Sequence, residues 1–244
     1  MYKGLAIDPI ETTTKKERIV GAIRKAILFG KLKPGHRIVE SHLARHLRVG
    51  NTAVREALFE LQSRGFVTRV ANKGTFVTQL TVDEVEQIFR ARREMEGLAA
   101  ELLQDRMTEA TLDSLQRCID EMRSAAAVVD LEVFCRLDVE FHTTIWHSSG
   151  NRFLAAALET MVLPLFAFFN MTCPPDRETL LAGVERHAEL LGALRDGRNV
   201  RKCMENAVDY FRAEKLMLLF DIRKGEHGQP DGNVETSPTL PLPG

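Results

Sequence analysis

Hydrophobic residues recur every three to four positions over most of the chain, which is the spacing of helices with one buried side. Between residues 40 and 63 this spacing predicts two short helices. Two strand-like runs, residues 66–70 and 75–78, then flank a turn at residues 72–74 that contains Asn, Lys and Gly. The apolar positions that define the two helices are Leu43, Ala44, Leu47, Val54, Ala57, Leu58 and Leu61.

Two helices followed by a hairpin have the layout of a winged helix-turn-helix, whose second helix enters the major groove of DNA. The distribution of charge supports this interpretation. Residues 11–80 carry 14 Lys and Arg against 5 Asp and Glu, a net charge of +9, whereas residues 81–244 carry 18 against 28, a net charge of -10. Because basic side chains bind phosphate, we expect the first segment to bind double-stranded DNA and the acidic remainder to stay off the duplex.

The pattern predicts a mainly α protein with two domains. Residues 15–80 form the winged helix-turn-helix, and residues 81–224 form an all-α bundle of about six helices, interrupted at 149–151, 174–175 and 196–199. We expect residues 1–14 to be a loose leader and residues 225–244, rich in Gly, Pro, Ser and Thr, to be a disordered tail. No run of about 18 consecutive apolar residues occurs, so the expected location is cytoplasmic, without a membrane partner.

The first domain resembles the GntR family of bacterial transcription regulators, whose helix-turn-helix reads close to PGxxLxExxLAxxLGVSRTPVREAL. The matching positions are Pro34, Gly35, Glu40, Leu43, Ala44, Leu47, Val49, Thr52, Val54, Arg55, Glu56, Ala57 and Leu58. The second domain is similar to FCD, the helical effector domain of the FadR subfamily. Its signatures here are Arg92, Glu96, Asp138, Phe141, His142, Gly150, Asn151, Glu185 and His187. The resemblance implies a homodimer that binds a palindromic operator and responds to a small metabolite.

The resemblance also implies which residues contact DNA: Ser41, Gly50, Asn51, Thr52, Arg55, Lys73 and Gly74. The family usually has Ser-Arg where this chain has Gly50 and Asn51. An asparagine at that position either reads adenine through its N6 and N7 atoms or caps the helix. Arg55 is either a DNA contact or a surface charge, and Lys73 is expected to contact phosphate.

A candidate metal site includes Asp138 and His142, which lie four residues apart and so project from one side of a helix. A solvated helix face would give the same spacing. His187 and Asp209 are equidistant from Arg198, so a helical hairpin turning there would place them opposite each other. Relatives that hold a metal commonly use one Asp and three His, and the third His falls on Asp209 here. The expected ion is Zn²⁺, Ni²⁺ or Mn²⁺, with two carboxylates shifting preference from zinc toward harder ions.

Arg92 and Glu96 are the candidate effector-binding residues. Their spacing of four is also that of an ordinary intrahelical ion pair. In the family, an arginine from this helix points into the cavity and binds a carboxylate, with the metal opposite as a second anchor. The resemblance therefore predicts a small organic acid as the effector.

Two other classes of function remain to be compared with a ligand-controlled regulator. A metal-dependent enzyme would need a general base, a nucleophile elbow or a glycine-rich phosphate loop, and the chain has no recognisable example. We therefore do not expect an enzyme. A pure metal sensor, in which the ion is the signal, would respond to metal without any organic acid.

Overall fold

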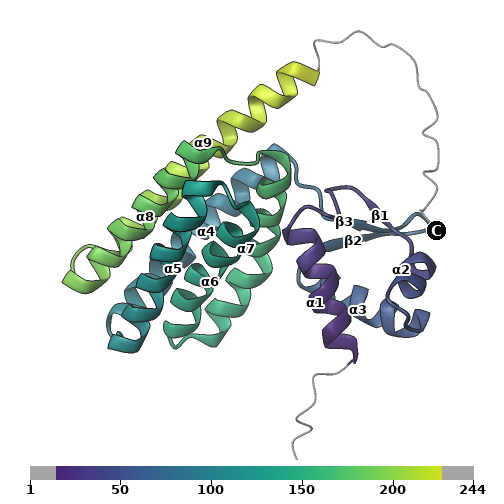
Figure 1. Cartoon of the computed structure of the whole chain (residues 1–244), viewed down its shortest axis with the longest axis horizontal. Coiled ribbons are helices and arrows are strands. Elements are labelled where there is room, and N and C mark those ends of the chain that lie inside the picture. Colours follow the sequence, from purple (N-terminus) through teal and green to yellow (C-terminus); the bar gives the residue numbers. More distant parts are fainter. Residues whose placement is uncertain (1–14, 227–244) are drawn as a thin grey trace, which may run out of the picture.

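The computed structural model describes residues 15–226, which form two units side by side (Figure 1). The predicted leader, residues 1–14, lies outside the described residues, and so do residues 227–244 of the predicted tail. The elements of the smaller unit are α1 (Lys15–Leu28), β1 (Arg37–Ile38), α2 (Glu40–His46), α3 (Asn51–Ser63), β2 (Val67–Val70) and β3 (Gly74–Val77).

The hairpin forms at the predicted turn. Strand β3 is the middle strand and pairs antiparallel with both β1 and β2. Val70 pairs with Gly74 at the end of the ladder, which leaves residues 71–73 as the loop. Asn72 and Gly74 have φ angles of 60° and 114°, a left-handed region that asparagine tolerates and glycine adopts at little cost. The turn residues thus give the wing its shape.

The predicted buried side of the second helix is confirmed in α3. Val54, Ala57, Leu58 and Leu61 are completely buried, and α3 packs against α1, α2 and β2. The opposite side of α3 is left facing solvent at its first turn, where Asn51 and Thr52 are exposed. One side of this helix therefore holds the unit together while the other remains available for binding.

The larger unit is an all-α bundle, as expected. Helix α9 packs along α4, α5 packs against α6 and α8, and α7 packs against α4 and α6. Thr81 begins α4 with a capping box, because its hydroxyl accepts from the Glu84 N–H while Glu84 accepts from the Thr81 N–H. The helices are α4 (Val82–Gln104), α5 (Glu109–Val128), α6 (Leu131–Ser148), α7 (Arg152–Thr172), α8 (Arg177–Asp196) and α9 (Val200–Glu226).

Helix α7 lies in the core of the bundle and also contacts α1 of the smaller unit. By length and composition alone it could cross a membrane, but 61% of its apolar window is buried inside the fold, as in the core helix of a soluble protein.

The contact between the two units includes one turn of α7, where Pro164 has no N–H to donate to the carbonyl of Thr160. Gly65, with φ of +75°, lies so close to that carbonyl that a Cβ there would be 2.9 Å from its oxygen. The two units therefore meet closely at a glycine.

Candidate functional site

The predicted DNA contacts are all exposed: Ser41, Gly50, Asn51, Thr52, Arg55, Lys73 and Gly74. They come from the starts of α2 and α3 and from the tip of the hairpin. Gly50 rather than Asn51 occupies the N-cap position of α3, and no side chain caps that end. The first-turn N–H groups of α3 consequently have no side-chain acceptor and are oriented to favour an anion such as phosphate.

Arg55 is held in place by a carboxylate at the start of α2. Its Nε donates to Glu40 at 3.0 Å, and Arg69 of β2 donates to the other oxygen of the same carboxylate at 2.9 Å. The Arg69 guanidinium also lies 4.2 Å from the ring centroid of Phe59, which is exposed. The carboxylate thus ties the second helix to the wing, and it places Arg69, which sequence reasoning missed, beside Arg55.

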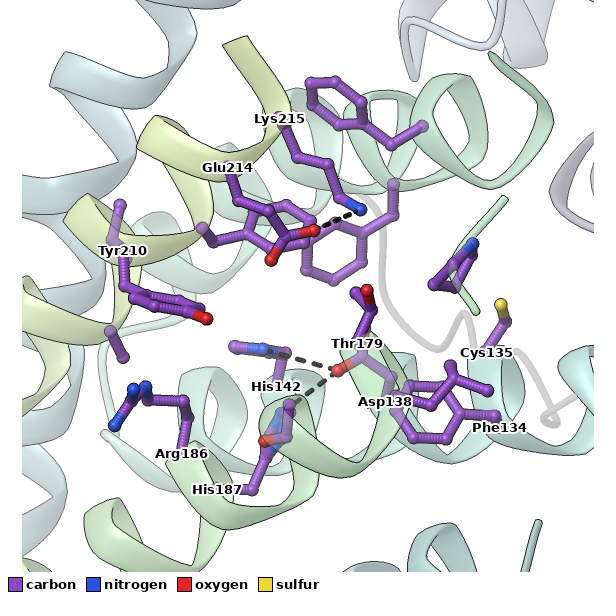
Figure 2. Close-up of a pocket in the computed structure, with 18 of the residues that line it drawn as sticks. Phe134, Cys135, Asp138, His142, Thr179, Arg186, His187, Tyr210, Glu214 and Lys215 are labelled. Carbon is purple, nitrogen blue, oxygen red and sulfur yellow. Dashed lines mark hydrogen bonds and ion pairs between the residues drawn. The ribbon is translucent and has the colours of Figure 1, made fainter. Parts of the chain in front are cut away.

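The structure brings three of the four predicted metal ligands together. Asp138 and His142 project from α6, His187 projects from α8, and one ligand atom from each lies within 4.8 Å of the others (Figure 2). The Asp138 Oδ1 atom is 3.0 Å from His187 Nε2 and 3.8 Å from His142 Nε2. Two helices therefore present one carboxylate and two imidazoles to a common point.

The tautomer of His187 suits a metal ligand. Its Nδ1 lies 2.7 Å from the carbonyl oxygen of Gly183, and because a carbonyl only accepts, Nδ1 must carry the proton. Its Nε2 faces the Asp138 carboxylate at 3.0 Å, is buried without a hydrogen bond of proper geometry, and is the atom left to hold either a second proton or a metal ion. In the first case His187 donates to Asp138, and in the second the carboxylate and the imidazole share the ion. A ring whose other nitrogen donates to a backbone carbonyl is the usual arrangement of a metal-binding histidine.

The ionisation of Asp138 also suits a metal ligand. Burial acts to raise the pKa of this carboxyl, but the imidazole of His187 and the charges of His142 and Arg92 lower it more, so the pKa lies below its ordinary value. The carboxylate is therefore charged at neutral pH, as a metal ligand must be.

Glu96 supports this site from behind. It is completely buried and accepts from Arg92 Nε at 2.9 Å and from Trp146 Nε1 at 3.1 Å. Its Oε1 also lies 3.3 Å from His142 Nδ1, although that N–H is not aimed at it. Burial would raise the pKa of Glu96, but the charges of Arg92 and His142 outweigh it and hold the pKa at about 2. The Glu96 carboxylate thus faces Nδ1 of His142, which leaves Nε2 on the side of Asp138.

A cavity of about 120 Å³ lies beside the three ligands. Arg92 forms part of its wall, with the guanidinium 4.8 Å from the ring centroid of Phe166 and 5.5 Å from that of Phe211. The Nη1 atom of Arg92 is buried and has no hydrogen-bond partner. Glu96, expected as an effector contact, does not line the cavity and instead orients Arg92. An arginine with a free donor beside three ligand atoms can receive a carboxylate.

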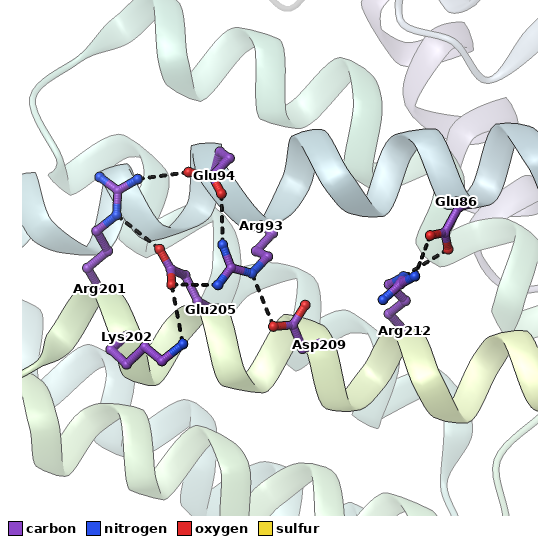
Figure 3. Close-up of polar contacts among 8 residues, drawn as sticks. All are labelled: Glu86, Arg93, Glu94, Arg201, Lys202, Glu205, Asp209 and Arg212. Atoms are coloured by element: carbon purple, nitrogen blue, oxygen red, sulfur yellow. Dashed lines mark hydrogen bonds and ion pairs between the residues drawn. The ribbon is translucent and has the colours of Figure 1, made fainter.

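Asp209, expected as the fourth ligand, does not lie with the other three. Its Oδ2 accepts from Arg93 Nε at 3.1 Å, and its side chain is 43% exposed, on the side of α9 that faces α4 (Figure 3). Helices α8 and α9 do form the expected pair. An equal distance from the turn, however, does not fix which side of the helix a residue occupies. Asp209 is roughly 160° around α9 from Phe211, which faces the cavity.

Sequence reasoning also missed cavity residues on α8 and α9. Arg186 stacks 4.4 Å from the ring centroid of Tyr210, and both line the cavity with Glu214 and Lys215. The available signal was spacing, since Tyr210 and Glu214 are four apart, as are Phe211 and Lys215. Charged residues at such spacing are usually on the solvated side of a helix, so the spacing alone does not predict that these residues line a cavity.

Comparison with known proteins gives two family matches. The model of "Bacterial regulatory proteins, gntR family" matches residues 15–77, and that of the FCD domain matches residues 87–208. The chain is 32% identical over 163 residues to the uncharacterized HTH-type transcriptional regulator YdhC of Bacillus subtilis (strain 168), covering 65% of this chain and 72% of that protein. It is 27% identical over 139 residues to the HTH-type transcriptional regulator McbR of Escherichia coli (strain K12), covering 57% and 63%.

Solved structures share the fold. The E. coli McbR/YncC structure has a TM-score of 0.75 at 21% identity and covers 87% of this chain and 100% of that chain. A transcriptional regulator GntR from Rhodococcus sp. RHA1 has a TM-score of 0.69 at 20% identity, covering 85% and 98%. The predicted fold class, a winged helix-turn-helix joined to an all-α bundle, is confirmed.

Proposed function

The chain belongs to the gntR family of bacterial regulatory proteins and carries an FCD domain, and we propose that a small organic acid, bound beside a divalent metal ion, controls its affinity for operator DNA. It is a DNA-binding transcription regulator rather than an enzyme, like the relatives it matches. The observation that carries the proposal is the Nη1 atom of Arg92, which has no hydrogen-bond partner. It belongs to a cavity that Asp138, His142 and His187 also line.

The metal is held by Asp138, His142 and His187. Two imidazoles and one carboxylate suit Zn²⁺, Ni²⁺ or Mn²⁺, and three protein ligands leave coordination positions open. When bound, the ion would supply positive charge and an open position for an effector carboxylate. The orientation of His187, with Nδ1 on the Gly183 carbonyl and Nε2 toward Asp138, and the ionised Asp138 support this assignment.

The replacement His187→Ala tests whether the three side chains bind a metal ion. Elemental analysis of the purified full chain should find close to one divalent ion per chain in the parent protein and almost none in the variant. His147→Ala is the matched control, because His147 is exposed and pairs with Glu159 outside the cavity. A parent protein without bound metal, even after incubation with Zn²⁺, Ni²⁺ and Mn²⁺, would refute the assignment.

The acid is tested by thermal shift with a panel of carboxylic acids, with and without Zn²⁺, on the parent chain and on Arg92→Lys. The substitution keeps the charge that balances Glu96 but removes the planar guanidinium and its free Nη1. We expect stabilisation by an acid to require both the ion and Arg92. If Zn²⁺ alone altered operator affinity and no acid had any effect, the metal-sensor alternative would replace this proposal.

DNA binding is assigned to Ser41, Gly50, Asn51, Thr52, Arg55, Lys73 and Gly74, whose exposure on α2, α3 and the wing supports this role. Arg55→Ala should abolish the footprint on the operator while circular dichroism remains that of the parent. Arg64→Ala removes a positive charge from the other end of α3 and should leave the footprint in place. An unchanged footprint for Arg55→Ala would overturn its assignment.

The remaining assignments rest on the family. We infer membership of the FadR subfamily, a division into residues 15–80 and 81–224, a cytoplasmic location, and a homodimer that places two recognition helices on two operator half-sites. The acid acts through unequal affinity for two arrangements of that dimer, with a coupling of about 1–3 kcal/mol. Analytical ultracentrifugation tests the dimer, and a monomer at micromolar concentration would contradict it.

A further inference from the structure

Lys215 is a buried lysine in the wall of the cavity. It projects from α9, only 3% of its surface is exposed, and its Nζ lies 5.1 Å from the ring centroid of Phe211 (Figure 2). Lysine is almost never fully buried unless it is paired, because removing an ammonium group from water is costly. The position of this amine therefore requires an explanation that packing does not supply.

The structure pairs Lys215 incompletely. Glu214 Oε1 lies 2.9 Å from Nζ but has no hydrogen-bond partner of proper geometry, so the contact is one of charge. Within the described part of the chain, no second carboxylate lies within ion-pair distance of Lys215. An ammonium group has three N–H donors, and a single neighbouring carboxylate cannot accept all of them.

Arg92 and Lys215 flank the same aromatic ring. The guanidinium is 5.5 Å and the amine 5.1 Å from the ring centroid of Phe211, so both cations border one cavity. Arg92 lies beside the three metal ligands, whereas Lys215 is one helical turn beyond Phe211 on α9. An acid anchored at Arg92 and the metal would therefore extend over Phe211 toward Lys215.

We propose that the effector carries a second anionic group, as in a dicarboxylate, and that Lys215 binds that group. This inference rests on the proposed function, since it takes the first carboxylate to be held by Arg92 and the metal. Three cationic side chains, Arg92, Arg186 and Lys215, line the cavity against two acidic ones, Asp138 and Glu214, and a divalent ion adds two further positive charges. A monocarboxylate would leave donors of a buried ammonium without acceptors, whereas a second carboxylate supplies them.

The test compares acids of equal chain length by isothermal titration calorimetry on the full chain saturated with Zn²⁺. The pairs are butyrate with succinate, pentanoate with glutarate, and hexanoate with adipate. In the parent protein, at least one diacid should bind about tenfold or more tightly than its monoacid, which is the gain expected from a charge-assisted hydrogen bond. Lys215→Met keeps the apolar stem and should bring the ratio of the two dissociation constants close to one.

Two further variants make the result specific. Lys202→Met removes an exposed lysine of the same helix, and it should retain the parent preference for the diacid. Glu214→Gln removes the negative charge beside Lys215, and it should strengthen diacid binding. If Glu214→Gln weakened diacid binding as Lys215→Met does, the pair would recognise a neutral polar group and the inference would be overturned.

The outcomes separate this inference from the proposed function. If monoacids and diacids bind equally well to the parent chain, only the second anionic group is refuted. The same holds if Lys215→Met, folded by circular dichroism, keeps the diacid preference. If none of the six acids binds with Zn²⁺ present, the organic-acid effector itself fails and this inference fails with it.

Discussion

The replacement Glu96→Gln tests whether one buried carboxylate organises the cavity. Glu96 is completely buried, and its two oxygens accept from Arg92 and Trp146 and lie near His142. Glutamine has nearly the same shape, so the replacement removes the charge without leaving a void. Arg92 would then be a buried cation whose guanidinium has lost its carboxylate.

The expected loss follows from the pKa of Glu96. The folded protein lowers this pKa from 4.5 to about 2, and at about 1.4 kcal/mol for each pH unit the charged form contributes about 3 kcal/mol. Breaking a buried ion pair by removing one partner costs about 3–5 kcal/mol, which agrees. Since the folded pKa lies below the unfolded one, the contribution is complete at pH 7 and is lost as the pH falls from about 4.5 to about 2.

Urea denaturation at pH 7 with a chelator present measures this loss without any contribution from bound metal. Glu101→Gln is the control, because Glu101 lies on the same helix, is 54% exposed and pairs with Arg201 at the surface. We expect the control to lose less than about 1 kcal/mol of the free energy of unfolding. A loss for Glu96→Gln no larger than that of the control would show that the buried charge does not hold the cavity together.

Three further predictions concern two glycines and one helix cap. Gly65→Ala should lower the free energy of unfolding by about 1–2 kcal/mol or more, because φ is +75° and the new Cβ would lie 2.9 Å from the Thr160 carbonyl oxygen. Gly21→Ala, in α1 with no atom within 4 Å of its Cβ, should raise stability by about 0.5–1 kcal/mol. Thr81→Ala should cost about 1 kcal/mol by removing the capping box of α4. Thermal and urea denaturation measure all three, and equal effects for the two glycines would contradict the close contact at Gly65.

Much of the fold follows from local signals in the sequence. The buried side of α3 was visible in the spacing of Val54, Ala57, Leu58 and Leu61, and the hairpin in the turn residues around Asn72. These signals are reliable because helix periodicity and turn conformation depend on neighbouring residues. The Asp138 and His142 pair was visible for the same reason, since both ligands lie on α6.

The rest of the site depends on how separate helices are rotated against one another. His187 reaches the pair on α6 while Asp209 does not, although both were placed by the same hairpin argument. Glu96 was expected to contact the effector together with Arg92, but only Arg92 lines the cavity. The spacing of two residues on a helix cannot show which of their side chains faces a cavity. Lys215 was missed because a charged residue in a helix is ordinarily solvated.

In the proposed function, a metal ion and an acid in the helical cavity together set the affinity of the chain for its operator. Fluorescence anisotropy at fixed salt, with a labelled fragment of its own upstream region, measures that affinity directly. We expect an acid to change the dissociation constant by about 5- to 150-fold when Zn²⁺ is present, and a chelator to abolish the change. An affinity that no acid alters with Zn²⁺ present, or that equals the affinity for random DNA, would contradict the proposed function.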